Sequence, residues 1–176
     1  MASSSLYLFP QEGLNYLLNV APKASTFPST TYLGLFTTSW GTIEGYGYTN
    51  INVTLNSGTY PVAEVSGTGG GGYARIALTS GNWGAPTTGT TVIGANTINV
   101  QQTTYNSALT FTCTSGTWSP VYGIFITTSG QLNSVSNGTS NTVLWYAPFS
   151  DQQPVTLASG DSLAITPTWQ SAPYPA

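Results

Sequence analysis

EVSGTGGGGYARIALT, residues 64–79, combines a glycine run with a strand pattern that contains an arginine, and it lies between the helical and the strand-rich parts of the chain. It contains Arg75, one of two basic residues, and Glu64, one of five acidic residues. After the glycine run 69–72, residues 73–79 alternate in polarity as a strand with one buried face does. We expect the preceding part of the chain to form an arm, a helix and a first strand. The part that follows should alternate strand and turn.

An arginine inside such a strand requires a partner, and two interpretations are open for Arg75. It pairs within its own chain with one acid, either Glu64 or Asp161. Alternatively it lies at a subunit boundary, where its guanidinium bridges two chains through carboxylates or carbonyl oxygens. Losing one partner of a buried pair costs roughly 3–5 kcal/mol. Arg75 is catalytic in neither interpretation.

Composition limits the class of protein. Charged residues make up 4% of the 176 residues, against about a quarter in an average soluble domain. The length suits one domain with its own core. No stretch has the roughly 18 apolar residues of a membrane span, and two cations are too few to neutralise a row of phosphates. We expect no membrane or nucleic-acid partner, and the low net charge favours self-association.

The residues that most enzymes need are absent from the sequence. The lack of histidine excludes the usual catalytic triads and most zinc sites. The single cysteine, Cys113, cannot form an intrachain disulfide and reads as a buried, inert thiol. The run 69–72 is not a phosphate loop, because no GK[ST] follows it. We therefore expect no catalytic residue, cofactor or metal; a glycosidase is the minor alternative, with four candidate carboxylates: Glu44, Glu64, Asp151 and Asp161.

The N-terminal region combines an apolar arm with a helix. In the arm, residues 1–10, four consecutive apolar residues either fold back as an edge strand or dock on a neighbouring subunit: Leu6, Tyr7, Leu8 and Phe9. Residues 11–21 have the helical period, with Glu12 in the first turn. Pro22 should end this helix. Its predicted apolar stripe, which we expect to pack against a sheet, consists of Leu14, Leu17, Leu18 and Ala21.

Residues 39–62 read as an inserted loop or exposed hairpin after a first strand at 32–37. This segment is rich in Gly, Asn and Thr, and long loops of this kind are usually functional. Its aromatic residues, including Trp40, Tyr46 and Tyr48, either pack on a symmetry mate or present rings to a ligand.

The rest of the chain predicts strands separated by turn residues. The candidate strands are 91–100, 107–114, 121–127, 141–149 and 162–168. Many short strands at this spacing favour a sandwich or barrel. The predicted fold is all-β: one jelly-roll-like antiparallel β-sandwich over residues 11–170, with one N-terminal α-helix and an extended arm. The proline-rich tail, residues 171–176, cannot pair centrally.

The order of these motifs resembles a family of small tailed-phage virion proteins, described as tail-fibre or minor structural proteins. The matching pieces are the helix, YLGLFT, EVSG, GYAR, SGTW leading to VYGIF, LWYA and VTLASGDSL, which span most of residues 12–168. Family members carry YLALFT, EVSGGGYAR, FGIFD and ASGD. This chain departs from them in its longer glycine run, in the insertion at 39–62, and in Ile126-Thr127 where an acid is expected.

The resemblance implies a β-sandwich building block of a phage particle. The favoured placement is a capsid decoration or cement protein, a homotrimer bound to the major capsid protein of the virion. A tail-fibre or distal-tail component that touches the host is the alternative, and a carbohydrate-binding β-sandwich module is the third. The expected interaction residues are Leu6, Tyr7, Leu8, Phe9, Trp40, Tyr46, Tyr48, Glu64 and Arg75.

Overall fold

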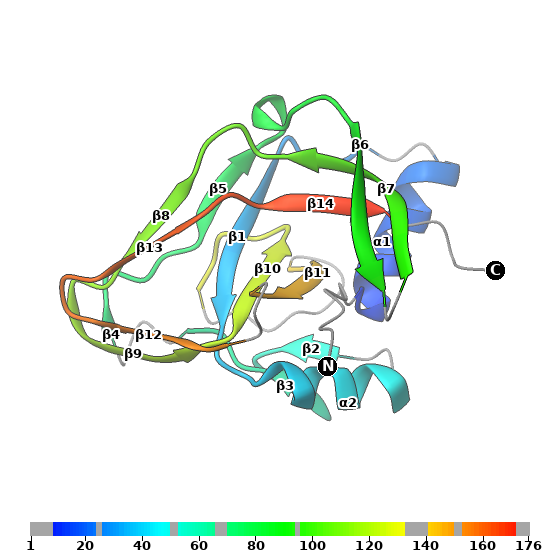
Figure 1. Ribbon diagram of the computed structural model, residues 1–176. Coiled ribbons are helices and arrows are strands. Elements are labelled where there is room, and N and C mark those ends of the chain that lie inside the picture. The colour runs from blue at the N-terminus through cyan, green and yellow to red at the C-terminus, as the bar shows by residue number, and fades with distance from the viewer. Residues whose placement is uncertain are drawn as a thin grey trace.

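The computed structural model describes residues 9–23, 26–49, 53–65, 70–93, 96–132, 141–149 and 153–171. Two α-helices and a 3-10 turn accompany the strands (Figure 1). In chain order the elements are α1 (Gln11–Lys23), β1 (Thr30–Phe36), α2 (Trp40–Thr49), β2 (Val53–Leu55), β3 (Tyr60–Val62), β4 (Gly70–Gly71), β5 (Ile76–Thr79), η1 (Ser80–Asn82), β6 (Thr87–Ile93), β7 (Asn96–Thr104), β8 (Leu109–Thr112), β9 (Ser115–Val121), β10 (Gly123–Thr127), β11 (Val143–Pro148), β12 (Val155–Ala158), β13 (Ser162–Ile165) and β14 (Thr168–Ser171).

The central sheet is antiparallel, in the order β11-β10-β1-β5, and both of its faces are covered. All five residues of β10 are buried. Successive side chains of a strand point to opposite faces, and here they enter two different cores instead of one core and water. Ile124 and Ile126 join the larger core, whereas Phe125 between them joins the smaller core beneath α2, β2 and β3.

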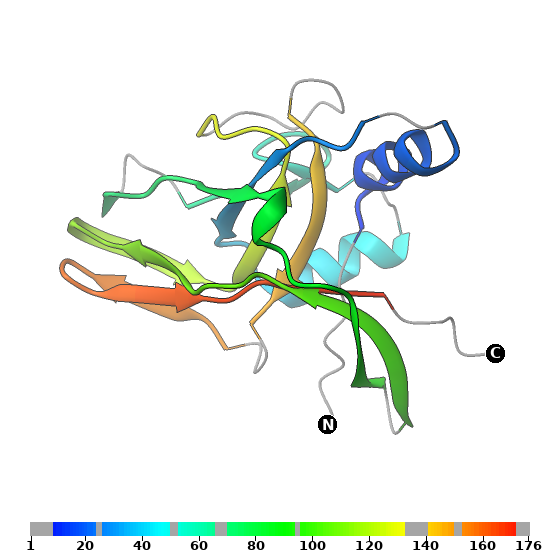
Figure 2. The same ribbon diagram turned by 90° about the horizontal axis from the view of Figure 1, so that it is seen from above.

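From β7 to β14 the chain forms a long antiparallel ribbon that extends from the central sheet over the larger core, with β6 and β4 paired along its edges (Figures 1 and 2). The segments pair in nested order: β10 with β11, β9 with β12, β8 with β13 and β7 with β14. With the central sheet, this ribbon makes the all-β sandwich that the sequence predicts. The described pairings do not join the ribbon into the two sheets of a jelly roll, so that finer prediction is not confirmed.

The prediction for residues 39–62 is wrong, because this segment contains α2 and the parallel pair β2–β3. Trp40 and Ile43 lie one helical turn apart and are buried in the smaller core. The Trp40 Nε1–H donates to Glu44 Oε1 at 2.9 Å, which ties the first turn together. Glycines 41, 45 and 47 lower the helix propensity of this segment. Burial against the sheet outweighs that propensity, and the described residues contain two α-helices where the sequence predicted one.

Other strand boundaries also differ from the predictions. The strand predicted at 91–100 covers parts of β6 and β7, which form a hairpin with Ile93 opposite Asn96. Strand β9 was not predicted, and it contains Pro120. Strands β12 and β14 were not predicted either. Ser171, placed in the tail by the sequence, belongs to β14, and residues 172–176 lie outside the described residues.

Helix α1 is present but packs differently from the prediction, and Pro22 lies inside its last turn. The helix contacts the edge strand β11. A Cβ at Gly13 would lie 2.7 Å from the Val143 carbonyl oxygen, so a glycine allows this close approach. Leu14 and Leu18 are 39% and 62% exposed. The expectation that the leucine stripe packs on the sheet is therefore wrong for these two residues.

No helix in the described part of the chain has both the length and the apolar character needed to cross a bilayer.

The glycine in α1 makes a testable prediction. Gly13→Ala should destabilise the protein, although Gly→Ala in a helix interior ordinarily stabilises by about 1 kcal/mol, because the new methyl group meets the backbone of β11. Gly45→Ala in α2 is the matched control, because its Cβ would meet nothing within 4 Å. Urea unfolding of both variants measures the effect. A stabilised Gly13→Ala variant would contradict the packing of α1.

Candidate functional site

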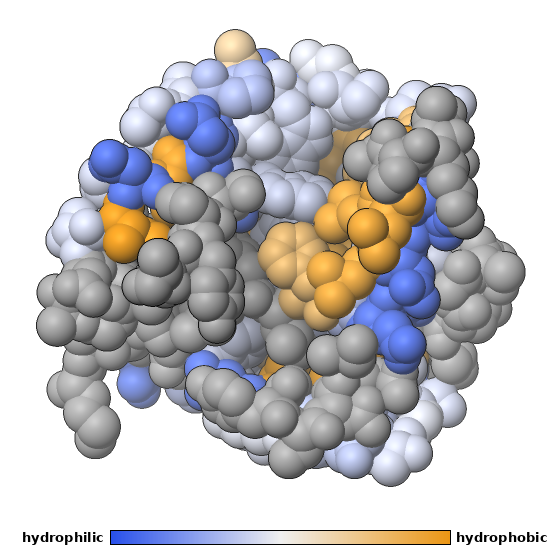
Figure 3. Space-filling view, turned by 90° about the vertical axis from the view of Figure 1, so that its right-hand side faces the viewer, coloured by the Kyte–Doolittle hydropathy of each residue, from blue (hydrophilic) through white to orange (hydrophobic). Residues whose placement is uncertain are grey.

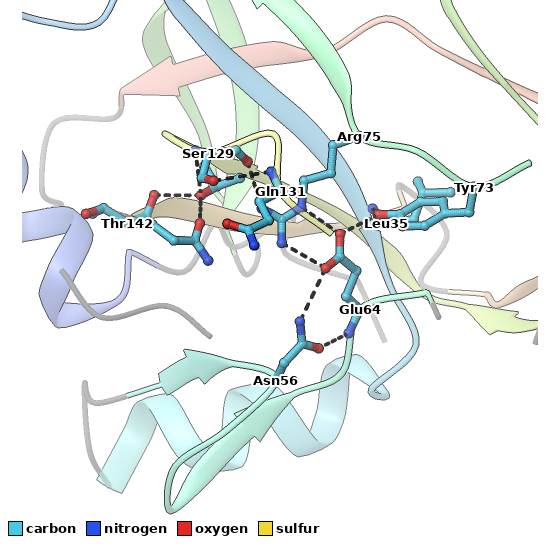
Figure 4. A network of polar contacts seen from close by, with 10 residues as sticks. Leu35, Asn56, Glu64, Tyr73, Arg75, Ser129, Gln131 and Thr142 are labelled. Carbon is cyan, nitrogen blue, oxygen red and sulfur yellow. Dashed lines mark hydrogen bonds and ion pairs between the residues drawn. The ribbon is translucent and has the colours of Figure 1, made fainter. Parts of the chain in front are cut away.

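A buried ion pair between Glu64 and Arg75 is the most highly connected polar feature in the described structure (Figure 4). Arg75 Nε donates to Glu64 Oε1 at 2.7 Å, and Nη2 donates to Oε2 at 2.8 Å. Both side chains have 0% relative exposure. Two parallel N–H···O bonds match the planar fork of a guanidinium to a carboxylate. The pair is therefore held in one geometry without water.

Two polar side chains complete the surroundings of the Glu64 carboxylate. The Tyr73 hydroxyl donates to Oε1 at 3.0 Å and accepts from the Leu35 N–H at 2.9 Å. Asn56 donates through Nδ2 to Oε2 at 3.2 Å, and its Oδ1 accepts from the Glu64 N–H at 2.9 Å. Asn56 has φ 60°, a left-handed conformation that asparagine tolerates. Each carboxylate oxygen thus accepts from Arg75 and from a second side chain, Tyr73 at Oε1 and Asn56 at Oε2.

The guanidinium extends the network to the segment that follows β10. Arg75 Nη1 donates to the Ser129 carbonyl oxygen at 2.7 Å. The Arg75 Cζ lies 5.3 Å from the centroid of the Phe125 ring, a cation–π distance. The Thr127 hydroxyl donates to the carbonyl oxygen of Thr142 at 2.9 Å. The network therefore joins the start of β5 to both ends of the segment between β10 and β11.

This geometry decides between the two interpretations of Arg75. The partner is Glu64 of the same chain, as the intrachain interpretation allowed, and the subunit-boundary interpretation is wrong because both side chains are closed off inside one domain. Asp161, the other proposed partner, is exposed, and its Oδ2 accepts from the Ala158 N–H at 2.8 Å in the turn between β12 and β13. The ion pair is structural, because its oxygens are occupied by donors from the protein.

Burial also changes the titration of two tyrosines. Desolvation raises the pKa of Tyr73 well above its ordinary value, and the charge of Glu64 raises it further. Desolvation likewise raises the pKa of Tyr146, with a contribution from the Glu12 charge. The Tyr146 hydroxyl is buried without a hydrogen-bond partner among the described residues. Both phenols therefore keep their protons at neutral pH.

The described carboxylates do not gather into a reactive cluster. Glu44 accepts from the Trp40 ring, Glu64 is in the ion pair and Asp161 holds a turn. Asp151 lies outside the described residues. In the described ranges no three of the Cys, Asp and Glu side chains lie together as metal ligands. Cys113 is buried, as predicted.

The structure places the predicted aromatic and arm residues in different surroundings. Trp40 is 3% exposed and belongs to the smaller core. The ring centroids of Tyr46 and Tyr60 lie 5.2 Å apart. The side chain of Tyr48 lies outside the described part of the chain. Phe9 packs on its own domain, with its ring centroid 6.2 Å from that of Trp169. The other arm residues, Leu6, Tyr7 and Leu8, lie outside the described residues.

An aromatic hollow that the sequence analysis did not single out lies near α1. Its volume is about 260 Å³, and its lining is almost entirely apolar. Phe27 is 37% exposed, and its ring centroid lies 5.9 Å from that of Tyr16 on α1. The hollow is lined by Phe27, Pro28, Thr31, Leu78, Ser80, Trp83, Thr103 and Trp169. These residues come from distant segments, so no local sequence pattern marks them.

Figure 3 shows an apolar area on the side of the molecule that is at the right in Figure 1, the side where α1 also lies. We call the exposed side chains of Leu14 and Leu18 on α1 the apolar face. Leu14 and Leu18 stand four residues apart, one above the other on the helix surface. In a chain with 4% charged residues, exposed apolar side chains favour protein contacts over free solvent.

The sequence matches no protein-family model and no curated protein.

The ion pair makes a second prediction. Arg75→Met should lower the free energy of unfolding by roughly 3–5 kcal/mol, because it leaves the Glu64 carboxylate buried and uncompensated. The double variant Glu64→Met/Arg75→Met should be more stable than Arg75→Met, because it removes both charges. Denaturant unfolding of the parent, of Glu64→Met, of Arg75→Met and of the double variant forms a double-mutant cycle, which measures the coupling between the two side chains. Additive losses from the two single changes would contradict the coupling.

The two buried tyrosines make a third prediction. Tyr73→Phe should cost about 1–3 kcal/mol, because the Leu35 N–H and Glu64 lose a partner. Tyr146→Phe is the matched control and should be neutral or stabilising, because its hydroxyl has no described partner. Urea unfolding at neutral pH compares them. Equal losses in both variants would contradict the assigned hydrogen bonds.

The raised pKa values of Tyr73 and Tyr146 also predict how the stability of the fold changes at alkaline pH. A tyrosine whose pKa is raised by folding contributes no pH dependence below its unfolded pKa of about 10. Above that pH the unfolded chain releases the proton while the folded chain keeps it, so stability falls as pH rises toward the folded pKa. Thermal unfolding between neutral pH and about pH 11 should therefore show a smaller alkaline loss in each Phe variant than in the parent.

Proposed function

We propose that this chain is a structural protein of a tailed-phage particle, a capsid decoration or cement protein that binds the major capsid protein as a homotrimer and stabilises the head shell. The apolar face is the observation that carries this proposal. Leu14 and Leu18 of α1 are exposed on a domain whose described residues already form two buried cores. Such a face suits attachment to another protein.

The buried polar network supports a mechanical role. Glu64 and Arg75 join segments that are far apart in the sequence and leave no free proton-transfer group at the pair. A particle protein requires a rigid shape and contact surfaces, which this arrangement supplies. The resemblance of the motif order to that of small virion proteins is consistent with the same role.

Placement in the tail is the second candidate, because the same apolar face would serve a fibre or distal-tail contact. The third candidate, a carbohydrate-binding module, is weaker than the sequence suggested. Its leading residue, Trp40, is buried in the smaller core and donates its ring N–H to Glu44. That ring cannot stack on a sugar in this structure.

The proposal predicts that Leu14→Ser/Leu18→Ser leaves the domain folded but weakens attachment to phage shells by at least about tenfold, because two apolar contacts are lost. Co-sedimentation with shells that lack the protein measures attachment. Asn15→Ser/Asn19→Ser, at exposed positions of the same helix, is the matched control and should bind as the parent does.

The copy number per particle separates the two placements in the virion. Quantitative mass spectrometry of particles from the encoding phage should give hundreds of copies for a shell protein, whereas a tail component is present in far fewer. A parent protein that does not bind shells and is absent from particles would overturn the proposed function. A small copy number would move the protein to the tail.

A further inference from the structure

We infer that the outer edge of β6 is a contact between two copies of this chain. In this contact, β6 of one molecule pairs antiparallel with β6 of a second molecule across a two-fold axis. The two three-stranded sheets then form one continuous sheet in the order β14-β7-β6-β6-β7-β14. This contact goes beyond the proposed function and does not depend on it, because the geometry of one hairpin defines it.

Strand β6 has one paired and one unpaired side in the described structure. Its sheet has the order β14-β7-β6, so β7 is its single neighbour there. In an antiparallel pair, every second residue of an edge strand directs its N–H and C=O groups away from its neighbour. No loop or turn in the described ranges contributes a backbone hydrogen bond to residues 87–93. The outer side of β6 therefore presents a row of donors and acceptors that fits another strand.

The edge also lacks the features by which proteins prevent edge strands from pairing. Strand β6 has seven residues, TTGTTVI, with no charged residue and no proline. Its register with β7 is regular from Thr87 opposite Gln102 to Ile93 opposite Asn96, with no bulge. The pairs β10–β11 and β9–β12, by contrast, contain register shifts. Neither charge, proline nor bulge in β6 therefore opposes the approach of a second strand.

The outer half of the hairpin is short of neighbouring strands. Strand β14 pairs with β7 only from Gln101 to Thr104, so residues 96–100 of β7 have β6 as their one partner among the described strands. Figure 2 shows this end of the hairpin extending beyond the rest of the ribbon. A hairpin of two strands is marginally stable in water, and further strands stabilise it. A strand added at the outer edge of β6 supplies that support.

The partner that best fits this edge is a second β6. Pairing over all seven residues places Thr87 of one copy opposite position 93 of the other, and Thr90 opposite its own counterpart. Threonine pairs across strands are favourable, and no like charges meet because the strand has no charge. A two-fold contact is isologous, so it uses the edge of each copy and leaves neither open. Association through β6 therefore joins chains in twos, including chains that belong to different homotrimers.

Single cysteines in the full-length chain test the pairing. Thr88 and Thr90 are both exposed on β6, and the native Cys113 is buried. In the proposed register, the two thiols of Thr90→Cys lie directly opposite, at a Cα separation of about 4.5–5.5 Å that a disulfide spans. The two thiols of Thr88→Cys are offset by four residues along the strand, about 13 Å, which is too far for a disulfide. Thr88→Cys is therefore the matched control.

We expect Thr90→Cys, under mild oxidation at high micromolar concentration, to form disulfide-linked pairs of chains on a non-reducing gel. Its yield should exceed that of Thr88→Cys by at least about tenfold, because only its thiols are within reach of each other. Equal yields, a higher yield from Thr88→Cys, or no linked pairs from either variant would overturn the proposed pairing.

Opposite charges at the same position give a second test. Thr90→Lys and Thr90→Glu each place like charges directly opposite, so each variant alone should associate about fivefold more weakly than the parent. An equal mixture of the two variants restores an attractive pair and should associate at least as tightly as the parent. Sedimentation equilibrium measures the dissociation constants. A mixture as weak as its two components, or association that neither substitution changes, would overturn the contact.

These outcomes are separate from those of the proposed function. Shell attachment is proposed to depend on Leu14 and Leu18 of α1, whereas the two-fold contact depends on β6. A shell-binding protein whose β6 variants behave like the parent would keep the cement role and lose only the two-fold contact. Linked pairs from Thr90→Cys in a protein that does not bind shells would keep the contact and remove the cement role.

Discussion

The bidentate contact between Glu64 and Arg75 is the interaction on which the rest of this structure depends. An ion pair without water is tolerated only when its remaining donors and acceptors are satisfied. Tyr73, Asn56 and the Ser129 carbonyl oxygen meet that requirement from three different segments. The pair therefore specifies how the strand after the glycine run, the β2–β3 region and the segment after β10 come together.

The central sheet follows from the same constraint. Glu64 forms a bridge with Phe36 at the end of β1, and the Leu35 carbonyl oxygen accepts from the Val65 N–H at 3.0 Å. These contacts bring the segment after β3 to the end of β1. The smaller core then closes one face of the sheet with α2, β2 and β3, while the outer part of the ribbon, β7–β9 with β12–β14, closes the other. A sheet buried on both faces leaves exposed apolar side chains to other elements, among them Leu14 and Leu18 of α1.

The sequence predicted the class of fold and one buried contact for identifiable reasons. The short β-rich segments between Gly, Ser and Asn turns predicted the all-β sandwich. The scarcity of charge made Glu64 one of two possible partners for Arg75. The sequence could not exclude Asp161 or choose between an intrachain and an intersubunit pair, because that choice depends on which strands become neighbours. The prediction at 39–62 failed because helix propensity is local, whereas burial of Trp40 and Ile43 against the sheet is not.

The sequence alone determined that this chain forms strands, contains an amphipathic segment after Pro10 and lacks the histidines and thiol pairs of common active sites. Periodicity and composition are local properties, so they can be read residue by residue. Only the tertiary structure decided that Gly13 meets β11 while Leu14 and Leu18 face outward. Only the tertiary structure assembled Phe27, Trp83 and Trp169 into a hollow. Both results depend on backbone approach between segments far apart in the chain, which no local pattern records.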